Sequence, residues 1–238
     1  MRRVFIADAH LRKPSDQNYQ LLLRFFSELR GTTSTLFILG DLFEFWVGYG
    51  AKEFPHYRPV LDALYELVNS GTEIVYFEGN HDFHLNGFFS HTLGATIYPN
   101  PTIVTLDGKR VFMCHGDLIN SRDYGYRLLR FLLHNQTTKA LIRLFPPRLV
   151  FRIADHLSSR SKEFHGERNM KWDYKTLLDN FAADRFQEGC DAVITAHFHL
   201  PHLTATGSGK ILLSLGDWIT QFTYGEFSKG SFSLHTYR

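Results

Sequence analysis

The most constraining feature of this sequence is a set of five short apolar runs, each of which leads directly into Asp, Asn or His residues. The five clusters are Asp8-Ala9-His10, Gly40-Asp41, Gly79-Asn80-His81-Asp82, His115-Gly116-Asp117 and His197-Phe198-His199. Apolar runs of four to eight residues between polar segments are typical of buried strands. The sequence therefore predicts five strands that end in residues able to bind a metal ion.

Segments with helical periodicity separate these strands in the first half of the chain. Apolar residues recur at helical spacing in 16–29 and in 59–68. Alternation of strands and helices predicts βαβ units and a mainly parallel sheet. Further strands are predicted at 102–106 and 110–114, joined by a hairpin at Asp107-Gly108, and at 192–195, 203–206, 211–215 and 231–235. We predict an α/β fold: two sheets, the second more antiparallel, flanked by helices in a single domain, 1–238.

The five clusters are expected to meet. In an open α/β sheet, the loops at the carboxyl ends of the strands converge on one crevice. A single D-x-H or H-x-H pattern is common by chance, but five clusters at successive strand ends are not. Four His, two Asp and one Asn suit Mn²⁺, iron or Zn²⁺, and no Cys takes part. The sequence therefore predicts a metal site at this crevice.

The middle of the chain differs from the rest. Residues from about 123 to 186 show helical periodicity, interrupted at Pro146-Pro147, and we interpret them as a helical insertion with outward basic faces. Between Arg122 and Lys175, twelve Lys and Arg face five Asp and Glu, a net charge of +7, which leaves −5 for the remainder. Either an anionic partner, such as phosphates or lipid head groups, or a solvated helical surface explains this excess.

Other features exclude several classes of protein. The apolar run near the N-terminus is too short for a secretion signal, and no stretch approaches the roughly 20 apolar residues of a membrane span. These features predict a cytoplasmic protein. Cys114 and Cys190 form no CxxC pattern and lie in apolar runs, so we predict two buried free thiols.

The ordered motifs D-x-H, GD, GNHD, HG and H-x-H resemble those of the calcineurin-like metallophosphoesterases. The resemblance implies one metal ion held by Asp8, His10, Asp41 and His199. It implies a second ion held by Asp41, Asn80, His115 and His197, with Asp41 bridging the two. It also implies that His81 and Asp82 are catalytic: His81 would be a proton donor or a contact of the transition state, and Asp82 would orient it. Ala196 stands where the family usually has Gly, and because both ligand positions remain, we expect Ala196 to need no left-handed backbone.

The segments FIADAHL, FILGDLFEFWVG, FEGNHDF and HGD, with the basic insertion after them, resemble the pyrophosphatases of lipid A biosynthesis that act on UDP-2,3-diacylglucosamine. This resemblance implies hydrolysis to UMP and 2,3-diacylglucosamine 1-phosphate, Mn²⁺ as the metal, and peripheral contact with the cytoplasmic face of the inner membrane. The insertion would form a cap over the acyl chains. Of its apolar residues, most are expected to bury the insertion's own core and a minority to touch lipid. The whole apolar set is Leu128, Leu129, Leu132, Leu141, Leu144, Phe145, Val150 and Ile153.

The resemblance also implies a set of substrate contacts: Asn80, His81, Asp123, Tyr126, Ser161, His165, Arg168 and His197. The sequence departs from the lipid enzymes at three of these positions. His81 replaces an Arg that would contact phosphate, and His165 and Arg168 replace an Asn and a Lys. Arg168 keeps the positive charge but not the geometry of Lys.

Three alternatives remain open. The first is a metallophosphoesterase of other specificity, such as a nucleotide pyrophosphatase or phosphodiesterase, which would not need an apolar, basic cap. The second is a non-catalytic scaffold, although such proteins lose metal ligands and all seven are present here. The third is a nuclease, which the basic excess favours, although no appended DNA-binding region is evident; steep salt dependence of DNA binding would support it.

Overall fold

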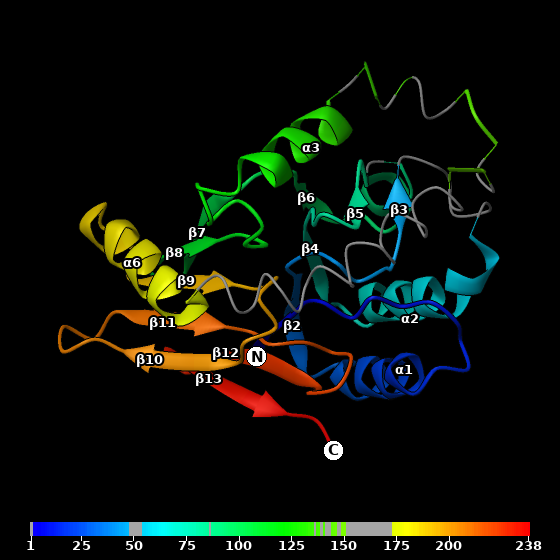
Figure 1. Cartoon of the computed structure of the whole chain (residues 1–238). Helices are drawn as coiled ribbons and strands as arrows, with labels where there is room; N and C mark the ends of the chain where they lie inside the picture. Colours follow the sequence, from blue (N-terminus) through cyan, green and yellow to red (C-terminus); the bar gives the residue numbers. More distant parts are fainter. Residues whose placement is uncertain are drawn as a thin grey trace.

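Two β-sheets packed face to face form the centre of the molecule, and helices cover their outer faces (Figure 1). The computed structural model describes residues 2–47, 54–85, 87–135, 137–138, 140, 144–146, 149–150 and 173–238. The first sheet has the strand order β13 (Ser231–Thr236), β12 (Thr223–Ser228), β1 (Arg2–Ile6), β2 (Thr33–Ile38), β4 (Glu73–Phe77) and β6 (Thr96–Tyr98). The second has the order β10 (His202–Ala205), β11 (Ile211–Ser214), β9 (Ala192–Thr195), β8 (Lys109–Met113) and β7 (Thr102–Leu106). A small parallel pair consists of β3 (Trp46–Val47) and β5 (Asp82–Phe83).

Both faces of the central strands are buried, which explains their continuous apolar runs. On β1, Val4 and Ile6 face the helices, whereas Phe5 faces the second sheet. Phe5 stacks on Phe37 of β2 with ring centroids 4.9 Å apart. The two sheets therefore share one core, and each central strand is fixed from both sides.

Helices α1 (Gln17–Leu29) and α2 (Arg58–Asn69) pack on the outer face of the first sheet, and α6 (Tyr174–Gln187) packs on the second. The helical periodicity of the sequence correctly predicts which side of α1 is buried. The residues buried there include Leu22, Phe25, Phe26 and Leu29. Short helical turns occur at η2 (Pro55–Tyr57) and η3 (Phe88–Thr92).

The predicted α/β class with two sheets and flanking helices is confirmed, as are the two buried free thiols. The structure adds two details of the sheets that were not predicted. The last predicted strand lies in the first sheet, where β12, which was not predicted, joins it antiparallel to β1. The second sheet is mixed, since β11, β9 and β8 run parallel.

Only the two ends of the predicted insertion are well described, as α3 (Tyr124–His134) and α6. The predicted helix at 148–156 falls almost entirely outside the described residues, and Leu141 and Ile153 lie outside them. Helix α3 lies along the edge of the molecule where the strands β4 and β6 end (Figure 1). Among the described residues, no helix is long and apolar enough to cross a membrane.

Candidate metal centre

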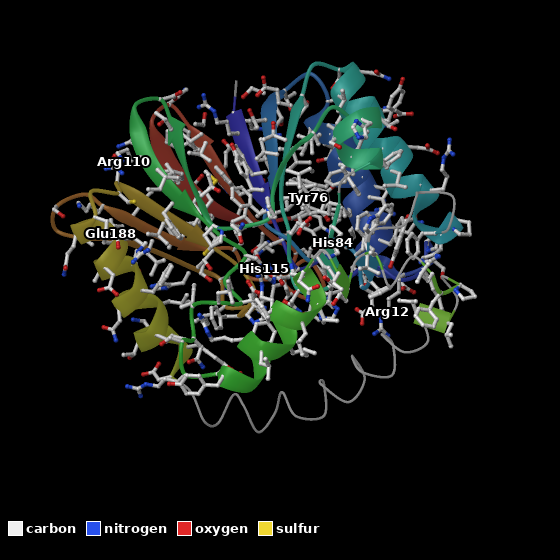
Figure 2. The ribbon with its side chains drawn as sticks, turned by 90° about the horizontal axis from the view of Figure 1, so that it is seen from above. Arg12, Tyr76, His84, Arg110, His115 and Glu188 are labelled. Carbon is white, nitrogen blue, oxygen red and sulfur yellow. The ribbon has the colours of Figure 1, made fainter. Side chains whose placement is uncertain are left out.

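The loops that follow β1, β2, β4, β8 and β9 meet at one edge of the two sheets, as the strand-end pattern predicts. His115 and Tyr76 lie near the middle of the molecule in Figure 2, whereas Arg110 and Glu188 lie at a distant edge. Five of the seven residues expected to bind metal have left-handed backbone conformations: Asp8, His10, Asp41, His197 and His199. Such conformations cost roughly 1–3 kcal/mol each and cluster at functional sites. Ala196 has no positive φ, as expected.

Two carboxylates each use one oxygen to hold the loops and present the other to the centre. Asp8 Oδ2 accepts a hydrogen bond from the backbone N–H of His197 (2.8 Å), while its Oδ1 is buried and accepts no hydrogen bond from any residue that the structure describes. Asp41 Oδ1 accepts from the N–H of His81 (2.8 Å). Asp41 Oδ2 then faces His10 Nε2 at 3.6 Å and His115 Nε2 at 3.4 Å. A buried carboxylate oxygen without a partner needs a cation.

The facing atoms fall into two groups that share Asp41 Oδ2. In the first, Asp8 Oδ1 lies 3.8 Å from His10 Nε2 and 3.7 Å from His199 Nε2. In the second, His115 Nε2 lies 3.0 Å from Asn80 Oδ1 and 3.2 Å from His197 Nδ1. Ligand atoms at about 2.1 Å from one ion are separated by about 3.0–3.4 Å. The two groups therefore fit two ions that share one carboxylate.

Three of the four candidate histidine ligands are oriented by partners on their outer nitrogens. His115 Nδ1 donates to the backbone carbonyl of Leu39 (2.7 Å), so its Nε2 is the nitrogen that faces the centre and that could bind an ion once deprotonated. His10 Nδ1 faces Glu44 Oε2 at 3.5 Å, and His199 Nδ1 faces Asp217 Oδ2 at 3.5 Å. These outer partners point the inward nitrogens at the candidate ion positions.

The pKa values of His115 and His197 are shifted in opposite directions. Burial opposes charge on His115, but the neighbouring Asp41 raises the pKa of His115 to about 10. Burial and the charge of His115 lower the pKa of His197 to about 3. Asp41 Oδ2, Asn80 Oδ1 and His197 Nδ1 all lie within 3.4 Å of His115 Nε2, so without a bound ion the protonated ring directs its Nε2–H at these three atoms. A divalent ion would displace that proton.

Glycine lets the loops approach each other. A Cβ atom on Gly79 would lie 2.2 Å from Asp41 Oδ1 and 2.6 Å from the Asp41 nitrogen. A Cβ on Gly40 would lie 2.7 Å from Gly79 Cα and His115 Nδ1. Glycine is therefore required at both positions because the loops of β2 and β4 touch there.

Asp82 and His81 do not form the expected pair. Asp82 Oδ1 accepts from the N–H groups of Asp41 (2.8 Å) and Gly79 (3.1 Å). Its Oδ2 accepts from the Tyr76 hydroxyl (2.6 Å) and from the N–H groups of Leu42 and Phe43. Burial and the charge of Asp41 raise the pKa of Asp82 to about 7, while the hydrogen bonds from Tyr76 and from the Asp41 N–H act in the opposite direction. The expectation that Asp82 orients His81 is wrong: Asp82 ties the loop of Asp41 to the loop of β4.

His81 is oriented by a backbone group instead. Its Nδ1 donates to the carbonyl of Glu44 (2.9 Å), and its ring meets the ring of His10 edge-on at 4.6 Å. Burial lowers the pKa of His81. His81 is therefore a neutral imidazole with its proton on Nδ1, which leaves Nε2 as a hydrogen-bond acceptor.

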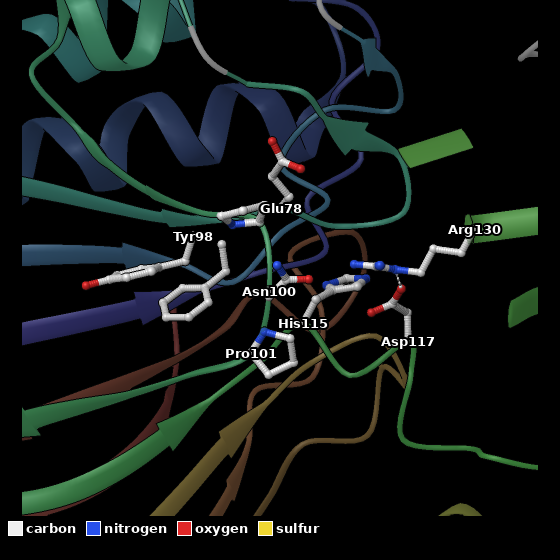
Figure 3. Close-up of a pocket in the computed structure, with 9 residues that line it drawn as sticks. Glu78, Tyr98, Asn100, Pro101, His115, Asp117 and Arg130 are labelled. Carbon is white, nitrogen blue, oxygen red and sulfur yellow. Dashed lines mark hydrogen bonds and ion pairs between the residues drawn. The ribbon is translucent and has the colours of Figure 1, made fainter. Parts of the chain in front are cut away.

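Helix α3 is attached beside the centre by polar contacts. The Tyr126 hydroxyl donates to Asp117 Oδ2 (2.7 Å), and Arg130 forms an ion pair with the same oxygen. Figure 3 shows the ion pair of Asp117 and Arg130 next to His115, at a small pocket that Tyr98 and Asn100 also line. The expected outward direction of the basic faces is wrong for Arg130, because the buried Asp117 draws it inward. Asp123 accepts from the N–H of Tyr126 (3.1 Å) and caps the helix.

The outer face of α3 is apolar but exposed. Leu128, Phe131 and Leu132 are exposed, and so is Leu144 further along. The expectation that most of these residues bury the insertion's own core is wrong for the exposed ones, Leu128, Leu129, Leu132, Leu144 and Phe145, whereas Val150 is half-buried. Ser161, His165 and Arg168 lie outside the described residues.

Three residues near the centre escaped the sequence reasoning as functional positions: Glu44, Asp117 and Asp217. Asp217 had a readable signal, because Leu215-Gly216-Asp217 follows β11 just as Leu39-Gly40-Asp41 follows β2. Glu44 and Asp117 lie within FILGDLFEFWVG and HGD, but their spacing in these motifs indicates no role for them. Their roles depend on the neighbours that folding brings to them.

The chain matches the family model of the calcineurin-like phosphoesterases over residues 1–201. A UDP-2,3-diacylglucosamine hydrolase of Stenotrophomonas maltophilia is 30% identical over 245 residues, covering 99% of this chain and 98% of the relative. The hydrolase of the same name from Pseudomonas syringae pv. tomato is 32% identical, covering 92% and 88%.

A solved archaeal phosphodiesterase is similar in fold, with a TM-score of 0.51 and 15% identity over 99% of both chains. The family match spans all five strand-end clusters. The chain therefore belongs to the calcineurin-like phosphoesterase family and is a metal-dependent phosphoester hydrolase.

Proposed function

We propose that this protein hydrolyses the pyrophosphate bond of UDP-2,3-diacylglucosamine and releases UMP and 2,3-diacylglucosamine 1-phosphate. The observation that carries the proposal is the pair of ligand groups sharing Asp41 Oδ2. Relatives about 30% identical over nearly the whole chain, named for this substrate, support the choice of phosphoester.

The seven residues of the two groups are proposed to hold two divalent ions, with Mn²⁺ as the physiological metal. The donor set of imidazole, carboxylate and amide oxygen suits Mn²⁺. Bound ions would supply an activated water and stabilise charge on the phosphoryl oxygens. The remaining chemistry belongs to the residues of the chain.

His81 is proposed to take part as an acceptor. Because its Nδ1 donates to Glu44, its Nε2 can accept a hydrogen bond from the attacking water. This role replaces the proton donation that the family resemblance suggests. Asp82 is proposed to act through Asp41, since its carboxylate holds the backbone of that residue.

Substrate binding is proposed to involve Asn80, His81, Tyr126 and His197 at the centre, together with Asp123 and with Ser161, His165 and Arg168 of the insertion. The Tyr126 ring lies 6.1 Å from the ring of His197, which places it at the rim of the centre. Asp123 contributes at least indirectly, since it caps the helix that carries Tyr126.

The lipid part of the substrate is supported by the outer face of α3. Tyr124, Leu128 and Phe131 are 77%, 60% and 70% exposed, which is costly for a surface that meets only water. Acyl chains, or the cytoplasmic face of the inner membrane, would cover such a face. We therefore propose a peripheral membrane association through the insertion.

Product analysis with a substrate panel tests this function. Purified protein with Mn²⁺ would receive UDP-2,3-diacylglucosamine in detergent micelles, UDP-N-acetylglucosamine, or bis-p-nitrophenyl phosphate. We expect UMP and the lipid phosphate from the first at a far higher kcat/KM. Preference for the soluble compounds would favour a phosphoesterase of other specificity. That alternative stays open because the neutral His81 stands where the lipid enzymes have an Arg.

Two variants control that experiment. Asp41→Ala removes the shared carboxylate and should abolish hydrolysis. Asp191→Asn changes a carboxylate that accepts from the backbone of Arg110 (2.7 Å), at the distant edge of the second sheet, and should leave hydrolysis unchanged (Figure 2). Turnover by the Asp41 variant would refute the assignment.

A further inference from the structure

The two ligand groups differ in what stands behind their histidines. In the group of Asp8, both imidazoles face a carboxylate with their outer nitrogen: His10 faces Glu44 and His199 faces Asp217, each at 3.5 Å. Both carboxylates are buried, with 4% of their surface exposed. Carboxylates in this position orient metal-binding imidazoles and increase their basicity.

These two carboxylates are themselves held in place. Asp217 Oδ1 accepts from the backbone N–H groups of Ile219 (2.8 Å), Thr220 (2.7 Å) and Gln221 (3.2 Å). That leaves Oδ2 directed at His199. Glu44 Oε1 accepts from Arg12 (2.5 Å), which leaves Oε2 directed at His10. Neither carboxylate needs to move in order to meet its histidine.

The other group has weaker support. His115 donates to a neutral backbone carbonyl, that of Leu39. Within the described part of the chain, Nε2 of His197 has no hydrogen-bond or ion-pair partner. This group also contains the neutral Asn80 where the first has Asp8. The first group therefore combines two ligand carboxylates with two supporting ones, and the second has only the shared Asp41.

We infer that the two ion positions are unequal, and that Glu44 and Asp217 are positioning residues that make the position of Asp8, His10, Asp41 and His199 the tighter one. This inference rests on the proposed two-ion centre. The first ion would stay bound, and the second, in the group of His115 and His197, would exchange with solution. Outer carboxylates of this kind typically change metal affinity by about 10–100-fold.

Calorimetric titration of the metal-free protein with Mn²⁺ tests the inference without using activity. The wild-type isotherm should show two separate steps, one ion per step. Electron paramagnetic resonance at one equivalent should show isolated Mn²⁺ rather than coupled pairs. Two equal steps, or coupled pairs at one equivalent, would overturn the inference. Fewer than two ions per chain would instead overturn the two-ion proposal.

Variants assign the tight step to its residues. Asp217→Asn places an amide beside His199 and should weaken the tight step about 10–100-fold while leaving the weak step in place. Glu44→Gln should do the same through His10. Glu78→Gln is the matched control, because Glu78 is also buried near the centre but accepts from the N–H of Leu85 (2.9 Å) rather than supporting a proposed ligand. Equal weakening in the control, or loss of the weak step alone in the Asp217 variant, would refute the assignment.

Discussion

Gly79→Ala adds a single methyl group at the point where the loops of β2 and β4 touch. The added Cβ would lie 2.2 Å from Asp41 Oδ1, 2.6 Å from the Asp41 nitrogen and 2.9 Å from Asp82 Oδ1. A Cβ atom essentially never lies closer than 3.0 Å to another heavy atom, so Asp41 must move by about 1 Å. Gly79 has no positive φ, so the substitution acts through this contact and not through backbone strain.

The expected effect is large on function and moderate on stability. Overpacking of this kind costs about 1–3 kcal/mol. Displacing a shared ligand by about 1 Å should lower kcat/KM roughly 100-fold and weaken binding of both ions. Urea unfolding of the metal-free protein, Mn²⁺ calorimetry and hydrolysis kinetics measure the three effects.

Gly207→Ala is the matched control. Gly207 also lacks a positive φ, and a Cβ there has no atom within 4 Å. This variant should match the wild type in all three measurements. If Gly79→Ala kept wild-type metal affinity and turnover, the close contact between these loops could not be what positions Asp41.

Three other perturbations test separate parts of the centre. Asp82→Asn should weaken metal binding and lower kcat together, because an amide cannot accept from all the donors that hold the loop of Asp41; wild-type metal affinity in this variant would contradict that role. Metal affinity should rise with pH up to about 10, because Asp41 raises the pKa of His115 and the ion must displace that proton; affinity independent of pH would contradict this. Arg130→Met leaves Asp117 buried without its cation, so hydrogen exchange in 124–134 should accelerate, while Arg127→Met, on the exposed side of α3, should have little effect.

The sequence predicts the strand ends well because two simple rules act there. The apolar runs must be buried on both faces, and carboxyl ends of parallel strands meet at one edge. The convergence of Asp8, Asp41 and Asn80 can therefore be predicted without knowing the loop structures. β12 escaped prediction because Gly225 and Glu226 interrupt its apolar pattern. Gly225 is needed there because a Cβ would lie 2.9 Å from Leu213 of the second sheet.

The partners of the site residues could not be predicted from spacing. Asp82 follows His81 in sequence, and adjacency suggested a pair, but the backbone turns its carboxylate towards Tyr76 and the N–H groups of the β2 loop. The orientation of α3 also escaped prediction. Its apolar residues suggest a buried face, whereas Tyr126 and Arg130 face Asp117, a contact set by the loop after β8.

The most direct test of the two-ion centre is anomalous diffraction from crystals grown with Mn²⁺. Two peaks should lie on either side of Asp41 Oδ2, about 3.5–4 Å apart, one near Asp8, His10 and His199 and one near Asn80, His115 and His197. Glu44 should remain outside both coordination spheres. A single peak, or an ion among His10, Glu44 and His81, where three potential ligand atoms also lie within 4.8 Å of one another, would contradict the account.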